Sequence, residues 1–194
     1  MNNPQRPLVV AAVETPGAAP LASPPVLGEP TAPKRFVIWG SLTCPYTAMA
    51  APILVRIVHD MPKAAAVEWR HLPIHPPDPA FHLAALSVPP AGTWPVIADI
   101  LAIVDKGGGD YSALTPEKLL EIVTKRGGSK DALDAAMNDP AKWALLKSDL
   151  IAGKLMGVKI TPGVFIDGYF LTPAGIPSDT AGFDKSLRAM VKAK

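Results

Sequence analysis

The hydrophobic and polar positions divide the chain into short apolar stretches near its two ends and longer helical stretches between them. Residues 34–39 read Lys-Arg-Phe-Val-Ile-Trp, an apolar run that predicts a strand buried on both faces. Residues 48–59 carry apolar side chains at helical spacing, and residues 67–72 predict a second strand. A strand, a helix and a strand in this order imply parallel strands joined by a right-handed crossover.

The middle of the chain predicts helices only. Apolar residues at helical spacing give expected helices at 78–87, 94–106, 116–126, 129–137 and 141–156. The third of these has the clearest start, because Thr115 is a good N-cap residue and Pro116 fits the first helical turn. Gly127 and Gly128 follow its end, where glycine commonly stops a helix. We expect a helical insert at about residues 78–140.

The last part of the chain predicts a hairpin and a helix. Residues 163–166 and 169–171 are apolar, and the Asp167-Gly168 pair between them favours a tight hairpin turn. Residues 179–192 then predict an amphipathic helix. The predicted fold class is therefore α/β, in a domain at residues 34–194 that begins with strand–helix–strand and ends with hairpin and helix.

Residues 1–33 differ from this domain in composition. They hold eight of the 23 prolines, many alanines and only three charged residues, without helical or strand periodicity. Proline removes backbone donors and favours extended conformations. We therefore predict a disordered tail that is rich in proline and alanine.

Charge and hydropathy exclude several classes of function. The net charge is +2, the signs are mixed along the chain, and no arginine-rich tract is present, so we expect no nucleic-acid partner. The longest apolar run near the start, Leu8–Val13, is too short for a transmembrane segment and lacks the features of a signal peptide. We therefore expect either a cytoplasmic protein or one whose export signal is not visible in this sequence.

The chain has one cysteine, Cys44, and four histidines. A single thiol forms no internal disulfide and no four-ligand zinc site by itself. His71 and His75 have a spacing found in metal sites, but two prolines follow directly, so we expect surface histidines and no metal.

Cys44 lies between the first predicted strand and the helix after it. A cysteine at the start of a helix faces unpaired backbone N–H groups and the positive end of the helix dipole, and both favour the reactive thiolate. In an open α/β sheet the carboxyl ends of the strands are also where ligands bind. The alternative is a packed cysteine that acts as a small apolar side chain.

Two motifs give a family resemblance. Thr43-Cys-Pro-Tyr-Thr47 opens the first helix, and Ile160-Thr-Pro-Gly163 precedes the hairpin. Together with the order of elements, they resemble the DsbA-like branch of the thioredoxin superfamily over about residues 34–193. The resemblance implies a thioredoxin-like fold with a helical insert and a cis bond between Thr161 and Pro162 beside Cys44. It also implies that the backbone before this proline pairs with an extended substrate, as in strand addition. In such a site Pro45, Tyr46, Thr161 and Pro162 would contact the substrate.

The departure from the family pattern is Thr47, which stands where the family has its second cysteine. A dithiol catalyst releases its substrate by internal attack on the mixed disulfide, whereas Cys44 needs an external thiol. The Thr47 hydroxyl can donate a hydrogen bond to the thiolate, or the residue can simply fill space and cap the helix. Glu68, on the second predicted strand, is a candidate for assisting proton transfer, although its facing is open.

The resemblance favours a thiol–disulfide oxidoreductase or isomerase that works through catalytic Cys44 and Thr47 on protein or peptide thiols and disulfides. It implies no resident cofactor, with glutathione as a candidate co-substrate, and a bacterial periplasmic location. A glutathione-dependent transferase or isomerase of the same fold, a redox-inactive peptide-binding or chaperone module, and a redox sensor based on Cys44 oxidation stay open as alternatives.

Overall fold

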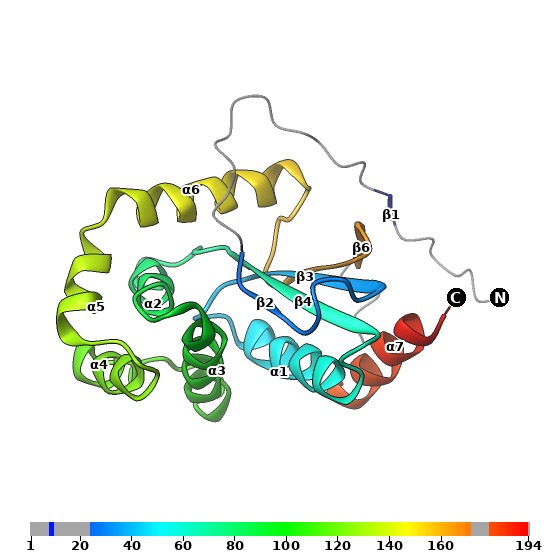
Figure 1. The fold of residues 1–194 in the computed structure, drawn as a ribbon, viewed down its shortest axis with the longest axis horizontal. Helices are drawn as coiled ribbons and strands as arrows, with labels where there is room; N and C mark the ends of the chain where they lie inside the picture. The colour runs from blue at the N-terminus through cyan, green and yellow to red at the C-terminus, as the bar shows by residue number, and fades with distance from the viewer. Residues whose placement is uncertain (1–7, 10–23, 172–178, 194) are drawn as a thin grey trace.

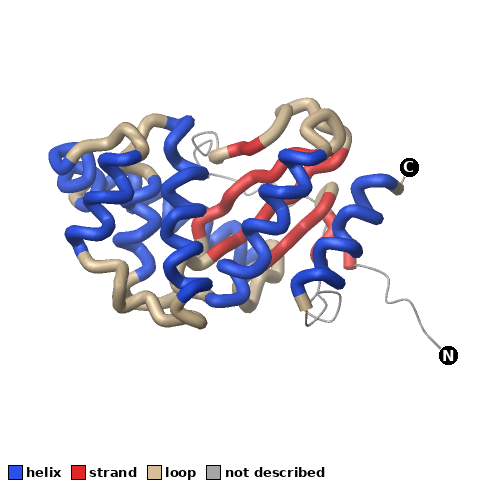
Figure 2. Tube along the Cα trace, turned by 90° about the horizontal axis from the view of Figure 1, so that it is seen from below, coloured by secondary structure: helices blue, strands red, loops and turns tan. Residues whose placement is uncertain are grey.

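The computed structural model describes residues 8–9, 24–171 and 179–193. Its strands form one sheet in the order β1-β6-β5-β3-β4-β2, with helices on both faces (Figure 1 and Figure 2). The strands are β1 (Leu8–Val9), β2 (Val26–Leu27), β3 (Lys34–Gly40), β4 (Ala65–His71), β5 (Gly163–Ile166) and β6 (Tyr169–Leu171). The helices are α1 (Pro45–Asp60), α2 (Asp78–Ala85), α3 (Pro90–Lys106), α4 (Pro116–Lys125), α5 (Lys130–Met137), α6 (Pro140–Leu155) and α7 (Thr180–Lys192).

The predicted strand–helix–strand unit is confirmed. β3 pairs in parallel with β4 along its whole length, from Lys34 opposite Ala65 to Gly40 opposite His71, and α1 connects the two strands. β3 also pairs antiparallel with β5. The carboxyl ends of β3 and β4 therefore meet at one edge of the sheet, and the loops that follow them share that edge.

The sheet divides the core into two parts. On one face, Phe36, Ile38 and Trp69 pack with α1, α3 and α7 in the larger apolar cluster. On the other face, Trp39 and Phe165 pack edge to face, with ring centroids 5.3 Å apart, beneath α6. Because β3 alternates its side chains between two covered faces, it is apolar at every position from Phe36 to Trp39, as a central strand requires.

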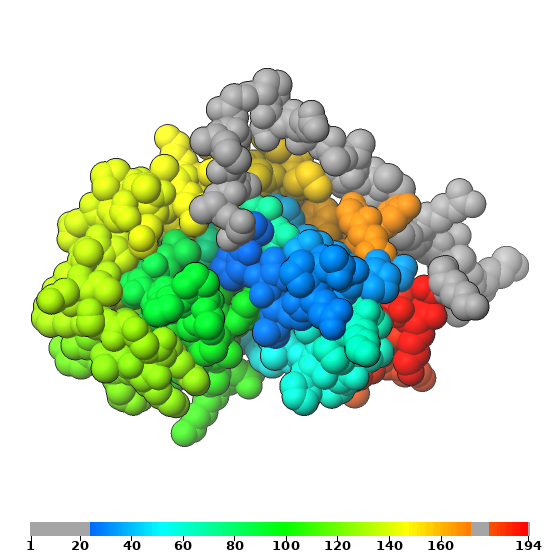
Figure 3. Space-filling model, viewed as in Figure 1, coloured from blue at the N-terminus to red at the C-terminus, as the bar shows by residue number. Residues whose placement is uncertain are grey.

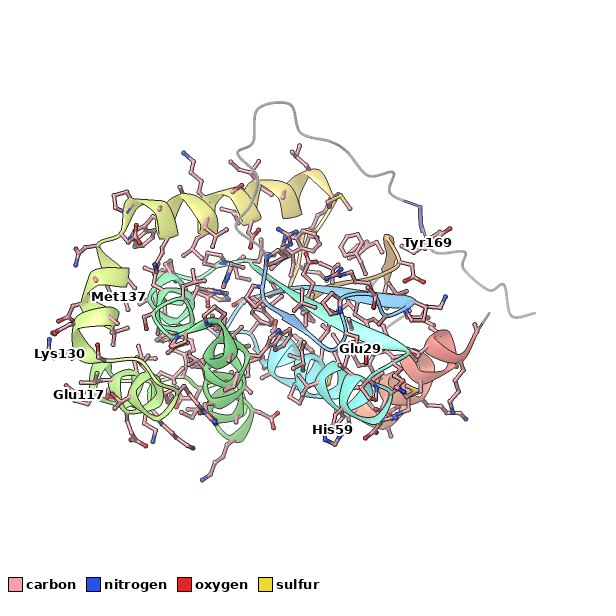
Figure 4. The ribbon with its side chains drawn as sticks, viewed as in Figure 1. Glu29, His59, Glu117, Lys130, Met137 and Tyr169 are labelled. Carbon is pink, nitrogen blue, oxygen red and sulfur yellow. The ribbon has the colours of Figure 1, made fainter. Side chains whose placement is uncertain are left out.

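Helices α2 to α5 form the end of the molecule away from α7, and α6 returns from there across the sheet (Figure 1 and Figure 3). The predicted start of α4 is confirmed, since Thr115 Oγ1 accepts a hydrogen bond from Lys118 N–H at 3.3 Å. Figure 4 shows the side chains of Glu117 and Lys130 pointing away from this helical region. Within the described residues, no helix is both long enough and apolar enough to span a membrane.

The predicted hairpin is confirmed. β5 and β6 pair antiparallel, and Asp167 (φ 50°) and Gly168 (φ 81°) form the turn between them in the left-handed conformation. The Asp167 carboxylate also accepts hydrogen bonds from Lys34 Nζ and Arg35 N–H, both at 3.0 Å. The hairpin turn is thereby attached to the start of β3.

The structure differs from the predicted tail at residues 24–33. Val26 and Leu27 form β2, which pairs antiparallel with Glu68 and Val67 on the outer edge of β4. The Pro25 carbonyl extends this pairing by accepting a hydrogen bond from the backbone N–H of Trp69. The same carbonyl also accepts a hydrogen bond from the indole N–H of Trp94. Proline at the end of an edge strand loses no ladder hydrogen bond, so the proline content hid this strand. Residues 8–9 pair with β6, and the rest of the tail lies outside the described residues.

Candidate active site

Cys44 is the N-cap residue of α1 and follows directly from the end of β3. Its backbone is extended (φ −89°, ψ 123°), and its carbonyl accepts the first hydrogen bond of the helix, from Ala48 N–H at 3.0 Å. No side chain caps this helix, and Pro45 takes the first helical position. The cysteine therefore holds the N-cap position, where a residue with a capping oxygen is usual, but its sulfur makes no hydrogen bond to the N–H groups of the first turn.

The second predicted motif lies beside this thiol. The Thr161–Pro162 peptide bond is cis, as the resemblance implies. Cys44 Sγ lies 3.4 Å from the Thr161 carbonyl oxygen and donates its hydrogen bond there. The cysteine is only 7% exposed, and Thr161 is 8% exposed. Two segments 117 residues apart in the sequence thus meet at one sulfur atom.

Exposed apolar side chains lie on the two motif segments and on two nearby loops. Tyr46 follows Pro45 and is 66% exposed, and Ile160, directly before Thr161, is 51% exposed. Ile74, in the loop after β4, and Tyr111, in the loop after α3, are also exposed. We call Tyr46, Ile74, Tyr111 and Ile160 the apolar rim. Apolar side chains gathered around a functional group are typical of surfaces that bind peptides.

Thr47 lies one turn from the sulfur but does not hydrogen-bond to it. It is fully buried, and its Oγ1 has no hydrogen-bond partner among the described residues. Its methyl group packs toward Gly40, where an added Cβ would lie 2.9 Å from Thr47 Cγ2. The sequence left open whether Thr47 hydrogen-bonds to the thiolate or fills space and caps the helix. Its methyl group fills space, but Thr47 does not cap the helix. The hydrogen bond to a thiolate stays a prediction, since the free hydroxyl is a buried donor without an acceptor.

The loop that carries Cys44 is fixed by a carboxylate that sequence analysis missed. Asp78, in the first turn of α2, accepts hydrogen bonds from Leu42 N–H at 2.8 Å and from Ile74 N–H at 3.1 Å. Burial by itself raises the pKa of Asp78, but the hydrogen bond and charge of His82, with a hydrogen bond from Ser41, outweigh it and leave that pKa lowered. The sequence signal that could have indicated this site is the i,i+4 spacing of Asp78 and His82 on a predicted helix, which places the two side chains next to each other.

The remaining candidates lie elsewhere. Glu68 points to the α6 face, where its carboxylate lies 2.6 Å from Arg70 Nε and 3.4 Å from Arg35 Nε. The structure does not bring it to Cys44. His75 is exposed as expected, but the expectation of a surface position is wrong for His71, which is buried at the end of β4. Within the described part of the chain, no three His, Cys, Asp or Glu side chains gather as metal ligands.

Comparisons with known proteins identify the fold that carries this site. A family model described as Thioredoxin matches residues 22–187. A protein-disulfide isomerase from Novosphingobium aromaticivorans has a similar structure, with a TM-score of 0.71 at 20% identity, over 89% of this chain and 100% of that chain. ScsC from Proteus mirabilis, in a transitional conformation, has a TM-score of 0.67 at 18% identity, over 87% of this chain and 72% of that chain.

The thiol-disulfide exchange protein alpha-DsbA2 from Wolbachia pipientis has a TM-score of 0.69 at 17% identity, over 87% of this chain and 85% of that chain. No curated protein sequence matches the chain. The family match spans most of the chain, and the three solved structures share its fold. The chain therefore belongs to the thioredoxin family and has the DsbA-like form of the thioredoxin fold, with Cys44 as its single cysteine.

Proposed function

We propose that the protein carries out thiol–disulfide exchange through Cys44 alone, by way of a mixed disulfide that an external thiol resolves. The observation that supports this most directly is the position of Sγ, at the N-cap of α1 and 3.4 Å from the Thr161 carbonyl. The helix terminus favours the thiolate, and the thiolate is the form that attacks a disulfide.

The exchange balances without any added oxidant. The Cys44 thiolate attacks one sulfur of a substrate disulfide, forms a new S–S bond, and releases the other sulfur as a thiolate that takes up a proton. An external thiol then gives up its proton and attacks the substrate sulfur of the mixed disulfide, which frees Cys44 as a thiolate. The net result exchanges one disulfide for another. Glutathione is the small thiol that we propose for the second step.

The substrate that fits this surface is an extended peptide. The apolar rim offers exposed side chains on the first turn of α1, on the loops that follow β4 and α3, and on the segment before Pro162. An extended peptide that pairs with the backbone at Thr161 would place its own sulfur next to Cys44. Apolar and aromatic side chains beside the substrate cysteine would then contact Tyr46 and Ile160.

A peptide-binding module without redox activity is the second candidate. The low exposure of Cys44 and the absence of a second cysteine favour it over a dithiol oxidase. The apolar rim would serve such a module equally well, so peptide binding alone does not separate the two functions.

The deciding experiment is to react the protein with oxidised glutathione and follow its mass, with Cys44→Ser as the control. We expect the wild type to keep one bound glutathione until an external thiol is added. Thr47→Cys restores the family's second cysteine at a buried site one turn away, so that variant should release the glutathione by forming an internal disulfide. Thr47→Ser is the matched control and should keep the adduct.

The pH dependence of Cys44 alkylation tests the same proposal independently. A half-maximal rate well below the value of about 8.5 for a free cysteine supports an activated thiol. Slow alkylation with an unshifted pH profile, and no glutathione adduct, would refute the exchange reaction and leave the binding module.

A further inference from the structure

Three titratable side chains form a buried cluster that the exchange reaction does not use. Asp78 and His82 lie one turn apart on α2 and are fully buried, and His71, at the end of β4, is 1% exposed. We call Asp78, His82 and His71 the Asp–His–His cluster. The two imidazoles approach with Nδ1 atoms 2.8 Å apart, and His82 Nε2 lies 3.4 Å from Asp78 Oδ1. Buried ionisable groups in contact must be paired or neutral, so their protons follow from the donors and acceptors around them.

The Trp69 indole fixes the first proton. Its Nε1–H can only donate, and it lies 3.3 Å from His71 Nδ1, so that nitrogen is an acceptor. The short contact between the two Nδ1 atoms then requires a proton on His82 Nδ1. His71 is therefore the neutral tautomer with its proton on Nε2, which has no hydrogen-bond partner among the described residues. Burial, with the charges of His82 and Arg70, keeps the pKa of His71 well below its usual value.

The two oxygens of Asp78 fix the second proton. Oδ1 accepts from Leu42 N–H and Oδ2 accepts from Ile74 N–H, so both oxygens already serve as acceptors, which favours the ionised carboxylate. A neutral His82 would turn a lone pair on Nε2 toward this carboxylate. A proton on Nε2 removes that repulsion, so the contact at 3.4 Å assigns both protons to His82 and an ion pair with Asp78, although Nε2 does not meet hydrogen-bond geometry there.

The other charged groups near the cluster are already engaged. Arg70, next to His71, lies 2.6 Å from a Glu68 oxygen and 3.1 Å from an Asp149 oxygen of α6. Asp149 also accepts a hydrogen bond from His71 N–H at 2.8 Å, and burial leaves the pKa of Asp149 raised despite that bond. These side chains face the opposite side of β4. Within the described residues, Asp78 is therefore the carboxylate in salt-bridge contact with His82.

We propose that His82 and Asp78 are positioning residues for Cys44: the ion pair keeps Asp78 ionised, and the carboxylate holds the Leu42 backbone, in the loop that leads to Cys44, and the Ile74 backbone, in the loop after β4. The proposal rests on Cys44 being the reactive group of the proposed function. Leu42 lies two residues before Cys44, and Ile74 belongs to the apolar rim. One carboxylate thus sets both the approach to the sulfur and the start of α1.

The ion pair also affects the charge at the site. With His82 protonated, Asp78 adds no net charge near Cys44. If the His82 charge is lost, Asp78 has two possible states. An ionised Asp78 is then an unpaired buried carboxylate, and its negative charge disfavours the thiolate. A protonated Asp78 accepts fewer hydrogen bonds, so the N–H of Leu42 or of Ile74 loses its acceptor. Either outcome makes Cys44 less reactive at neutral pH.

The test combines a spectrum of the unmodified protein with matched variants. Nitrogen-15 NMR of the imidazoles at pH 7 should show His82 protonated on both nitrogens and His71 protonated on Nε2 alone. In His82→Gln and Asp78→Asn, the pH profile of Cys44 alkylation by iodoacetamide should move to higher pH by half a unit or more, with a rate at pH 7 at least threefold lower. His75→Gln is the control, because His75 is an exposed histidine in the loop before α2. The alkylation profile of this variant should match that of the wild type.

A neutral His82 in the wild-type spectrum, or an unchanged alkylation profile in folded His82→Gln, would overturn the proposal. The spectrum needs no variant, so it decides the point even if the variants fail to fold. If wild-type Cys44 is alkylated but forms no glutathione adduct, the proposed exchange reaction is wrong. The positioning role of the Asp–His–His cluster is then still tested by the spectrum and the alkylation profiles.

Discussion

Replacement of Gly40 by alanine is the sharpest test of how the core supports the active-site loop. Gly40 is the last residue of β3, and the chain turns from it toward Cys44. An added Cβ would lie 2.2 Å and 2.7 Å from two ring carbons of Trp69 and 2.9 Å from Thr47 Cγ2. Ordinary carbon–carbon contacts are about 3.5–4.0 Å, so the Trp69 ring must move by more than an ångström.

The structure leaves that ring little room. Trp69 is fully buried, its centroid lies 5.8 Å from that of Trp94, and its indole N–H donates to His71. Overpacking of a tight core costs about 1–3 kcal/mol. Loss of the indole hydrogen bond adds about 1 kcal/mol. We therefore expect Gly40→Ala to lower the free energy of unfolding by about 2–4 kcal/mol.

Urea unfolding of the wild type, Gly40→Ala, Trp69→Phe and the double variant measures this cost. The smaller ring of phenylalanine removes the atoms that the new Cβ would meet, so the double variant should be more stable than the sum of the single losses by about 1 kcal/mol or more. A Gly40→Ala loss below about 0.5 kcal/mol, or costs that simply add, would refute the steric argument.

Three further predictions use stability measurements. Gly153→Ala should lower the free energy of unfolding by about 1–3 kcal/mol, because its Cβ would lie 2.8 Å from Trp39 Cδ1, and denaturant titration measures the loss. Asp99→Asn should cost about 0.5–1 kcal/mol at pH 7. The hydrogen bond from Arg126 lowers the pKa of Asp99 in the folded state, so this contribution is fully present above about pH 4, where the unfolded carboxyl titrates, and is lost as the pH falls through the lower folded pKa; denaturation at pH 7 and at successively lower pH should show the difference shrink. In the hairpin turn, Asp167→Ala should cost about 1–2 kcal/mol and Asp167→Asn less, since asparagine tolerates the left-handed conformation; thermal unfolding gives this ranking.

The order of elements could be predicted because each signal is local. The Asp-Gly turn, the Thr115-Pro116 helix start and the continuous apolar run of β3 each lie within a few residues. Helix boundaries near proline were harder. Helix α3 starts at Pro90 and contains Pro95, whereas the sequence predicted a start at residue 94. Proline at the first helical position lacks only an N–H that would be unpaired anyway.

The active site was predictable only in part. Cys44 and Thr161 follow from two short motifs, and the structure joins them. The contact between Leu42 N–H and Asp78 spans 36 residues, and that between His71 and His82 joins a strand to a helix. Such contacts depend on how α2 packs against β4, which periodicity does not specify. In the sequence, these contacts are indicated only by a pair of polar residues on the inner face of a predicted helix.

Strand β2 bears on where a shortened form of this protein can begin. A chain cut at Lys34, where the composition changes, would lose Val26 and Leu27 and leave the outer edge of β4 unpaired. An open edge next to apolar residues is a template for pairing with another chain, so such a fragment should associate and precipitate. The Trp94 indole would also lose its acceptor at Pro25. The stable unit for expression therefore begins before Pro25, inside the proline-rich segment.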